Sequence, residues 1–306
     1  MTARAATFAQ RLAFQCFRAI AWWLGVLPYR AALAFAWPFA ALSWAILLPI
    51  RRRTDRRIRS VFPEKTPRER RRIAWRAWRN LFFTGVDSIR IPRLGAAWIE
   101  RYVETPDLGI VRRIQASGKG VVIAVPHLGS WEIAGLALAT RGFPFYVMFR
   151  AQRNPLINDW LLRSRGTFGL EIIEQRSRRA ATIARDVAKD RAVFVVLPDI
   201  RAKERTGIPV KFLGADTLFP CAPAHCAREA ACPVVTAEVV RTGWTRHAWR
   251  ATGEIAPDPA NARDEDARRI TAFVAEKFDA SVRAHPECYF WFNSRWVLPG
   301  EKKDRK

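Results

Sequence analysis

Two kinds of apolar pattern alternate along the chain from Gly118 onward: short runs rich in β-branched and aromatic residues, and segments with apolar residues at helical spacing. The short runs predict strands at Val121–Val125, Phe145–Phe149, Glu171–Ile173, Ala192–Leu197, Pro209–Phe212, Val234–Val239 and Trp249–Ile255. The longer segments predict helices at Trp131–Thr140, Pro155–Arg165, Arg178–Asp190, Ala222–Ala231 and Asp264–Ala284. This alternation predicts an α/β fold in which helices flank a mixed, mostly parallel sheet.

The N-terminal part has a different pattern, because no residue between Ala31 and Ile50 is charged. About 20 apolar residues suffice for a helix to span a bilayer, but Pro38 and Pro49 interrupt this stretch. A membrane span, a pair of helices lying in the interface, and a buried helical hairpin all stay open. The arginines that follow predict a cytoplasmic face in contact with anionic lipid. They are Arg51, Arg52, Arg53, Arg56, Arg57 and Arg59.

A further helix is predicted over Glu64–Arg90, with Trp75 and Trp78 on an apolar face and arginines on the other. Such a helix lies either on a membrane or on a solvated protein surface. We expect three parts in the chain: a membrane-anchoring or interfacial segment over residues 1–60, a main domain over residues 61–300, and a basic tail over residues 301–306.

Composition adds information about partners. Lys and Arg number 52 and Asp and Glu 28, which leaves a net charge of +24, so the partners are expected to be anionic. The 13 Trp and 19 Phe favour a membrane surface over nucleic acid, since Trp suits the boundary between lipid and water. The five cysteines have no metal-site or redox spacing and no glycine-rich phosphate loop is present, so we expect neither a metal nor a cofactor.

The segment from Val121 to Glu132 carries the strongest chemical signal. A buried strand ends at Val125, a turn follows, and His127 lies at the edge where α/β proteins bind ligands. Glu132 lies one turn into the next helix, from which we expect it to reach the imidazole. A histidine supported by a carboxylate can take the proton of a hydroxyl that attacks a thioester.

Other interpretations of the same residues stay open. Ser130 can cap the helix, while Glu132 complements the helix dipole and His127 is an ordinary core residue. Ser130 as a nucleophile is disfavoured, because the sequence has no G-x-S-x-G turn.

Six ordered blocks resemble one family across nearly the whole chain. They are Phe62-Pro63-Glu64 after the arginines, His127 to Glu132, Arg150 to Pro155, Leu197-Pro198-Asp199, Pro209 to Gly214, and Trp291 with Arg295-Trp296. The chain resembles the late acyltransferases of lipid A biosynthesis, the lauroyl/myristoyl type, within the H-x-x-x-x-D/E glycerolipid acyltransferase superfamily. It departs from their usual pattern at Ile200, where Gln is common, and at Asn293, where His is common.

The resemblance implies an acyl-acyl carrier protein donor, a phosphorylated glucosamine-based lipid acceptor and a place at the inner membrane, with the catalytic domain facing the cytoplasm. It also implies catalytic roles for His127 and Glu132. The expected substrate-binding residues are Arg150, Arg153, Asn154, Asp199, Lys211, Gly214 and Arg295. Solvated arginines and a plain edge strand are the alternatives for several of them. An acyltransferase acting on another lipid, such as a lysophospholipid, an ornithine lipid or a mannosylated inositol lipid, and a non-catalytic membrane-binding relative stay open as alternative functions.

Overall fold

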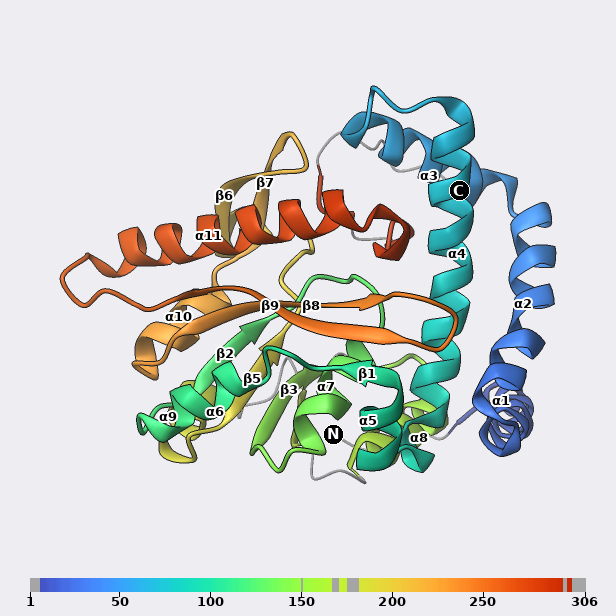
Figure 1. The fold of residues 1–306 in the computed structure, drawn as a ribbon, viewed down its shortest axis with the longest axis horizontal. Coiled ribbons are helices and arrows are strands. Elements are labelled where there is room, and N and C mark those ends of the chain that lie inside the picture. Colours follow the sequence, from blue (N-terminus) through green and yellow to red (C-terminus); the bar gives the residue numbers. More distant parts are fainter. Residues whose placement is uncertain (1–5, 150, 167–170, 175–181, 294–295, 299–306) are drawn as a thin grey trace.

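The computed structural model describes residues 6–149, 151–166, 171–174, 182–293 and 296–298. Its centre is a seven-stranded sheet in the order β1-β9-β8-β2-β5-β3-β4, shown in Figure 1. The strands are β1 Val103–Glu104, β2 Val121–Ala124, β3 Phe145–Phe149, β4 Glu171–Glu174, β5 Val193–Val196, β8 Val234–Arg241 and β9 His247–Ile255. Strands β8, β2, β5, β3 and β4 run parallel, and β9 turns back antiparallel to β8. The predicted α/β class with a mixed, mostly parallel sheet is confirmed.

Helices cover both faces of the sheet, because successive side chains of a strand point to opposite faces. In β2, Val121 and Ile123 join a core with α5 Ala96–Tyr102, α6 Gly109–Ala116 and α7 Trp131–Ala139. Val122 and Ala124 join the opposite core with α9 Ile183–Lys189, α10 Ala222–Glu229 and α11 Arg263–Ala284. Strands buried on both faces explain why β2 and β5 are continuous apolar runs in the sequence.

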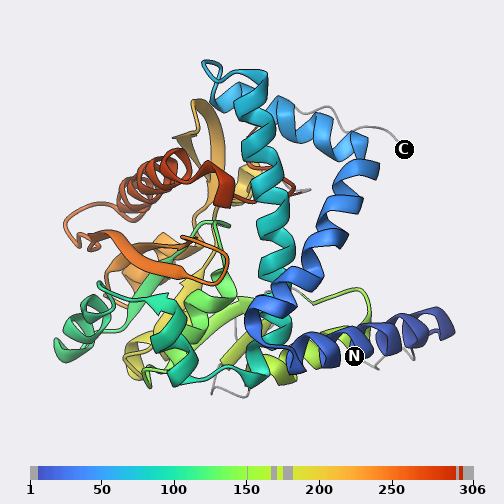
Figure 2. The same cartoon turned by 45° about the vertical axis from the view of Figure 1, so that its right-hand side comes forward.

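The N-terminal helices stand beside one end of the sheet, on the right of Figure 1 and again in Figure 2. They are α1 Phe8–Val26, α2 Tyr29–Ile46, α3 Leu48–Val61 and α4 Pro67–Arg90. Between α2 and α3 the chain bends by 87°, and among the described residues only this bent pair, not any one helix, has the length and apolar character of a span. The apolar stretch Ala31–Ile50 is therefore divided between two helices.

A buried polar cluster holds α2 against the sheet and α4. The Tyr29 hydroxyl donates to Oδ1 of Asp87 at 2.7 Å and lies 3.1 Å from Nε2 of His247. Arg241 at the end of β8 forms an ion pair with Asp87, and both side chains are almost fully buried. Buried charges need partners of this kind, so the cluster fixes where α2 begins.

Most predicted elements are confirmed within one or two residues, including α8 Pro155–Gly166. The predicted helix Glu64–Arg90 is confirmed as α4, which begins three residues later, at Pro67. The start of the predicted helix Arg178–Asp190 lies outside the described residues, which place α9 from Ile183 onward. The predicted strand Pro209–Phe212 does not join the main sheet. As β6 Gly207–Phe212 it forms a separate hairpin with β7 Ala215–Pro220, which the sequence pattern missed.

Candidate active site

His127 meets Asp199 because their strands are neighbours in the sheet. Strands β2 and β5 are parallel, and Ala124 is the register partner of Val196. Each strand is followed by an apolar residue, a proline and a polar residue, Val-Pro-His over residues 125–127 and Leu-Pro-Asp over residues 197–199. In each turn the residue after the polar one donates its N–H to the proline carbonyl. Equal offsets from one paired position therefore place the imidazole beside the carboxylate.

Both carboxylate oxygens of Asp199 bind His127. Oδ1 lies 2.6 Å from Nδ1 of the ring, and Oδ2 accepts the backbone N–H of His127 at 2.8 Å. A carboxylate facing Nδ1 keeps the proton on that nitrogen, which leaves the lone pair of Nε2 as the basic site. Burial lowers the pKa of His127, but the charge of Asp199 and its hydrogen bond outweigh burial and raise the pKa above 6.5.

The structure corrects the expected pairing of His127 with Glu132. Glu132 lies in the first turn of α7 and forms an ion pair with Arg165 of α8, whose Nε donates to Oε2 at 3.1 Å. The ring's carboxylate partner is Asp199, for which the family resemblance implies a role in substrate binding. Ser130 is the N-cap of α7, yet its buried hydroxyl has no hydrogen-bond partner within the described residues, so its side chain does not cap the helix.

The C-terminal segment supports the histidine from the other side. The N–H of Phe290 donates to the His127 carbonyl at 2.9 Å, and the N–H of Gly129 donates to the Cys288 carbonyl at 2.8 Å. The buried hydroxyl of Tyr289 hydrogen-bonds Asp199; burial, together with the carboxylate, raises the pKa of the phenol well above 10.0. The protonated phenol is therefore a donor to the carboxylate that orients His127.

Gly129 is required in this turn. Its φ of +65° is favourable only for glycine, and a Cβ at this position would lie 1.7 Å from the Val239 carbonyl oxygen. The close approach brings the turn after His127 against β8.

An apolar cavity of about 470 Å³ lies beside the ring of His127. Polar groups in its wall include Glu132, Arg165, Gln152 and Asn293. Its apolar lining includes Ile91, Trp131, Leu136, Phe145, Val147, Met148, Phe149, Val195 and Phe290. A concave, mostly apolar space with a few polar groups around one basic nitrogen fits an aliphatic chain that carries a reactive end.

The other predicted site residues do not gather in this cavity. Arg153 is exposed, while Asn154 accepts the N–H of Leu156 at the start of α8 and donates to the Gln10 carbonyl at 2.9 Å. Lys211 is exposed in β6, and Gly214 lies in the β6–β7 turn with a φ of +83°. None of these four residues lines the cavity, so their expected contact with substrate stays a prediction. Arg150 and Arg295 lie outside the described residues.

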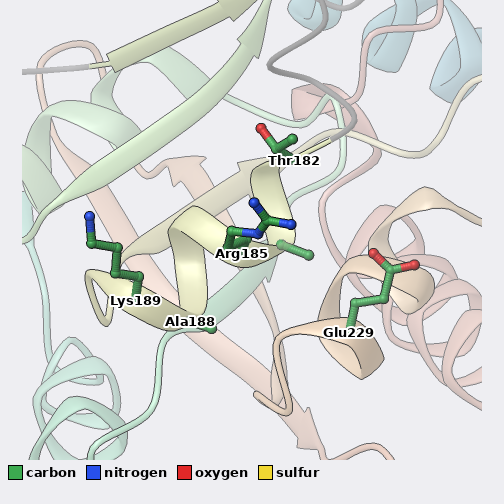
Figure 3. Close-up of a pocket in the computed structure, with 6 residues that line it drawn as sticks. Thr182, Arg185, Ala188, Lys189 and Glu229 are labelled. Carbon is green, nitrogen blue, oxygen red and sulfur yellow. The ribbon is translucent and has the colours of Figure 1, made fainter.

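Figure 3 shows a larger hollow of about 610 Å³, formed by one face of α9 and Glu229 of α10. It carries Arg185 and Lys189 but shares no lining residue with the cavity at His127. Although this hollow has the larger volume, its described lining includes no histidine, and its one carboxylate, Glu229, forms an ion pair with Arg263 at 2.9 Å. The cavity at His127 is therefore the candidate active site.

A comparison with protein families agrees with this chemistry. Residues 8–297 match the family described as bacterial lipid A biosynthesis acyltransferase. The chain belongs to this family. It is an acyltransferase, and the family resemblance expected from the sequence is confirmed.

Relatives of this acyltransferase differ in the lipid that their names give. The phosphatidylinositol mannoside acyltransferase of Mycobacterium tuberculosis strain H37Rv is 23% identical over 229 residues, 72% of this chain and 67% of the relative. The Mycolicibacterium smegmatis protein of the same name is 23% identical over 237 residues, 75% and 72% of the two chains. Lipid A biosynthesis acyltransferase 2 of Shigella flexneri is 32% identical over 112 residues, 35% and 34% of the two chains.

Proposed function

We propose that this acyltransferase moves a fatty acyl chain from an acyl-acyl carrier protein to a hydroxyl of a lipid A precursor, with His127 as the general base. The observation that carries the proposal is His127, paired with the buried Asp199, in the wall of an apolar cavity. A thioester whose chain lies in that cavity brings its carbonyl near Nε2. An acceptor hydroxyl at the same place can then be activated and acylated directly, without an acyl-enzyme intermediate.

The chemical steps follow from the orientation of the ring. Asp199 keeps the proton on Nδ1, so Nε2 takes the hydroxyl proton while the hydroxyl oxygen bonds to the thioester carbonyl carbon. The tetrahedral intermediate then breaks its carbon–sulfur bond. The thiolate leaves with the proton from Nε2, which returns the neutral ring. Glu132 keeps Arg165 in the cavity wall, where the guanidinium also packs over the ring of Phe149 at 4.9 Å.

We place the reaction at the cytoplasmic face of the inner membrane, with residues 1–60 as the anchoring segment. In the described residues, the exposed large apolar side chains other than Trp244 lie between Phe8 and Leu48. α1 reaches the catalytic domain through the contact of Asn154 with Gln10 and the packing of Phe17 against Trp160 at 4.9 Å. Because Trp160 belongs to α8, which lines the cavity through Arg165, a lipid acceptor has a short path from the membrane.

We further propose that the remaining predicted site residues bind the substrates. They are Arg150, Arg153, Asn154, Lys211, Gly214 and Arg295. The net charge of +24 favours association with an acidic carrier protein, chiefly by raising the rate of encounter.

A mannosylated inositol lipid is the second candidate acceptor. It is favoured by the phosphatidylinositol mannoside acyltransferases, which align over a much larger share of this chain than the Shigella flexneri protein does. The carboxylate–imidazole pair serves either acceptor, because both offer a hydroxyl.

The experiment that tests the proposal compares the two acceptors directly. Purified full-length protein receives acyl-acyl carrier protein labelled in its acyl chain, with either a lipid A precursor or a phosphatidylinositol mannoside. We expect labelled lipid A and no product from the His127→Ala variant. Product from the inositol lipid alone would establish the second candidate. Equal rates with wild type and His127→Ala would contradict both assignments.

A further inference from the structure

A second cavity, away from His127, lies where α2, α3 and α4 meet. It encloses about 370 Å³ and is called here the arginine groove. It is lined by Trp44, Leu48, Arg51, Arg52, Asp55, Pro67, Arg70, Arg71 and Ala74. It shares no lining residue with the catalytic cavity. Figure 1 shows the corner of the molecule where the end of α2, the helix α3 and the start of α4 come together.

Two helix faces with the same spacing build the arginine groove. Residues three, four and seven positions apart share one face of a helix. α3 contributes residues 48, 51, 52 and 55, and α4 contributes residues 67, 70, 71 and 74. Each helix thus turns two neighbouring arginines into the same space. The sequence predicts two separate sets of arginines, one after the apolar stretch and one on a face of the helix Glu64–Arg90, and the fold brings two from each set into one cavity.

The charges in the groove are mostly uncompensated. Arg70 is fixed by Oδ1 of Asp55 at 2.9 Å and by the Lys65 carbonyl at 2.7 Å. Among the residues that the structure describes, no carboxylate pairs with the guanidinium groups of Arg51, Arg52 or Arg71. Planar guanidinium groups hold phosphate oxygens in pairs, so this arrangement suits a phosphate better than a single carboxylate.

One rim of the groove is apolar. Leu48 at the start of α3 lines it and is 48% exposed, while Leu42 and Ile46, two positions from Trp44 and so on another face of α2, are 62% and 65% exposed. Trp44 lies inside the groove, where Arg51 packs over its ring at 5.3 Å. Apolar side chains that give way to an aromatic ring and then to arginines match the order of acyl chain, interface and headgroup in a membrane.

We propose that the arginine groove binds the phosphate of an anionic membrane phospholipid, whose acyl chains lie against the exposed end of α2. Arg52 and Arg71 bind the phosphate oxygens. Arg70, which Asp55 and the Lys65 carbonyl hold in place, lines the groove beside them. α3 also carries Arg57, whose Nη1 donates to the carbonyls of Trp291 at 2.5 Å and Asn293 at 3.0 Å. Because Asn293 lines the catalytic cavity, a lipid held in the groove sets the position of that cavity relative to the headgroups.

The test measures binding of full-length protein to vesicles of phosphatidylcholine alone and of phosphatidylcholine with phosphatidylglycerol. The variant Arg52→Gln/Arg71→Gln changes two exposed groove residues, and the control Arg112→Gln/Arg268→Gln removes the same charge from exposed positions on α6 and α11. We expect about thirtyfold weaker binding of the groove variant to phosphatidylglycerol vesicles, from the attraction of two basic residues to an anionic surface. Equal losses in groove and control variants, or no loss in either, would overturn the proposal.

A second arm identifies the source of the phosphate. The KM for acyl-acyl carrier protein, measured with a detergent-solubilised acceptor, is expected to be the same in wild type and in the groove variant. A raised KM with unchanged vesicle binding would assign the groove to the donor and refute the lipid site. Because vesicle binding requires no turnover, its outcome is independent of the proposed reaction.

Discussion

The substitution Asp199→Asn tests the orientation of the catalytic ring without changing its shape. Oδ2 of Asp199 accepts the backbone N–H of His127, a group that can only donate. The asparagine must therefore place its oxygen there and turn its NH₂ group toward Nδ1, the position now held by Oδ1 at 2.6 Å. Nδ1 then becomes an acceptor and the ring proton moves to Nε2, which loses the lone pair that accepts the hydroxyl proton.

The expected loss is that of the general base. We expect kcat to fall by about 10²- to 10⁴-fold, because this is the usual contribution of a positioned base, with little change in KM. The pH profile gives a second measurement. Only the neutral ring accepts a proton, so kcat/KM of the wild type rises with pH through the raised pKa of His127, and its acid limb lies above pH 6.5. Asp199→Asn removes the charge that raises the pKa of His127, so this pKa falls. The residual kcat/KM of the variant should therefore begin to rise at lower pH than that of the wild type.

Glu132→Gln is the matched control, since it makes the same chemical change in the carboxylate that lines the cavity beside His127. Glu132 pairs with Arg165 and not with His127, so the substitution should leave the pKa of His127 unchanged. The residual activity of the variant should therefore rise over the same pH range as that of the wild type. Initial rates with labelled acyl-acyl carrier protein at a series of pH values measure both variants. If Glu132→Gln shifts the limb and Asp199→Asn leaves it in place, the assignment of Asp199 as the partner of His127 is wrong.

Three further predictions concern the fold and the cavity. Gly129→Ala should lower kcat about a hundredfold, the effect of misplacing a catalytic group by about 1 Å, because its Cβ meets the Val239 carbonyl; initial rates on protein checked by circular dichroism measure this. Asp87→Ala should destabilise the protein by about 3–5 kcal/mol in urea unfolding, because it leaves Arg241 buried without its counter-charge. Gly135→Leu should lower kcat/KM most for the longest acyl donors, about fourfold for each excluded methylene, in a series of donor lengths.

Local patterns were sufficient for most of the fold. Buried parallel strands such as β2 and β5 are unbroken apolar runs bounded by turns, and α11 has a clear helical period, so both kinds of element were predicted from the sequence. The strands that were missed have weaker signals. β1 is two residues long, and β7 follows β6 through a tight turn in which Leu213 and Gly214 have positive φ. Pro49 marks the break between α2 and α3, because it lies in the first turn of α3, but the angle of the bend depends on how both helices pack on α4, which is not local.

The partner of His127 was missed because distance along the chain is a poor guide at a sheet edge. Glu132 is five residues away, but it extends from the first turn of α7 toward α8, whereas Asp199 is 72 residues away and reaches the ring through strand pairing. A signal was present, since two buried strands each end in an apolar residue, a proline and a polar residue. Its use requires knowing that β2 lies beside β5 and that Ala124 pairs with Val196, and both facts are non-local. In a parallel sheet, polar residues that follow different strands at equal offsets are therefore stronger candidates for a catalytic pair than polar residues that are close in sequence.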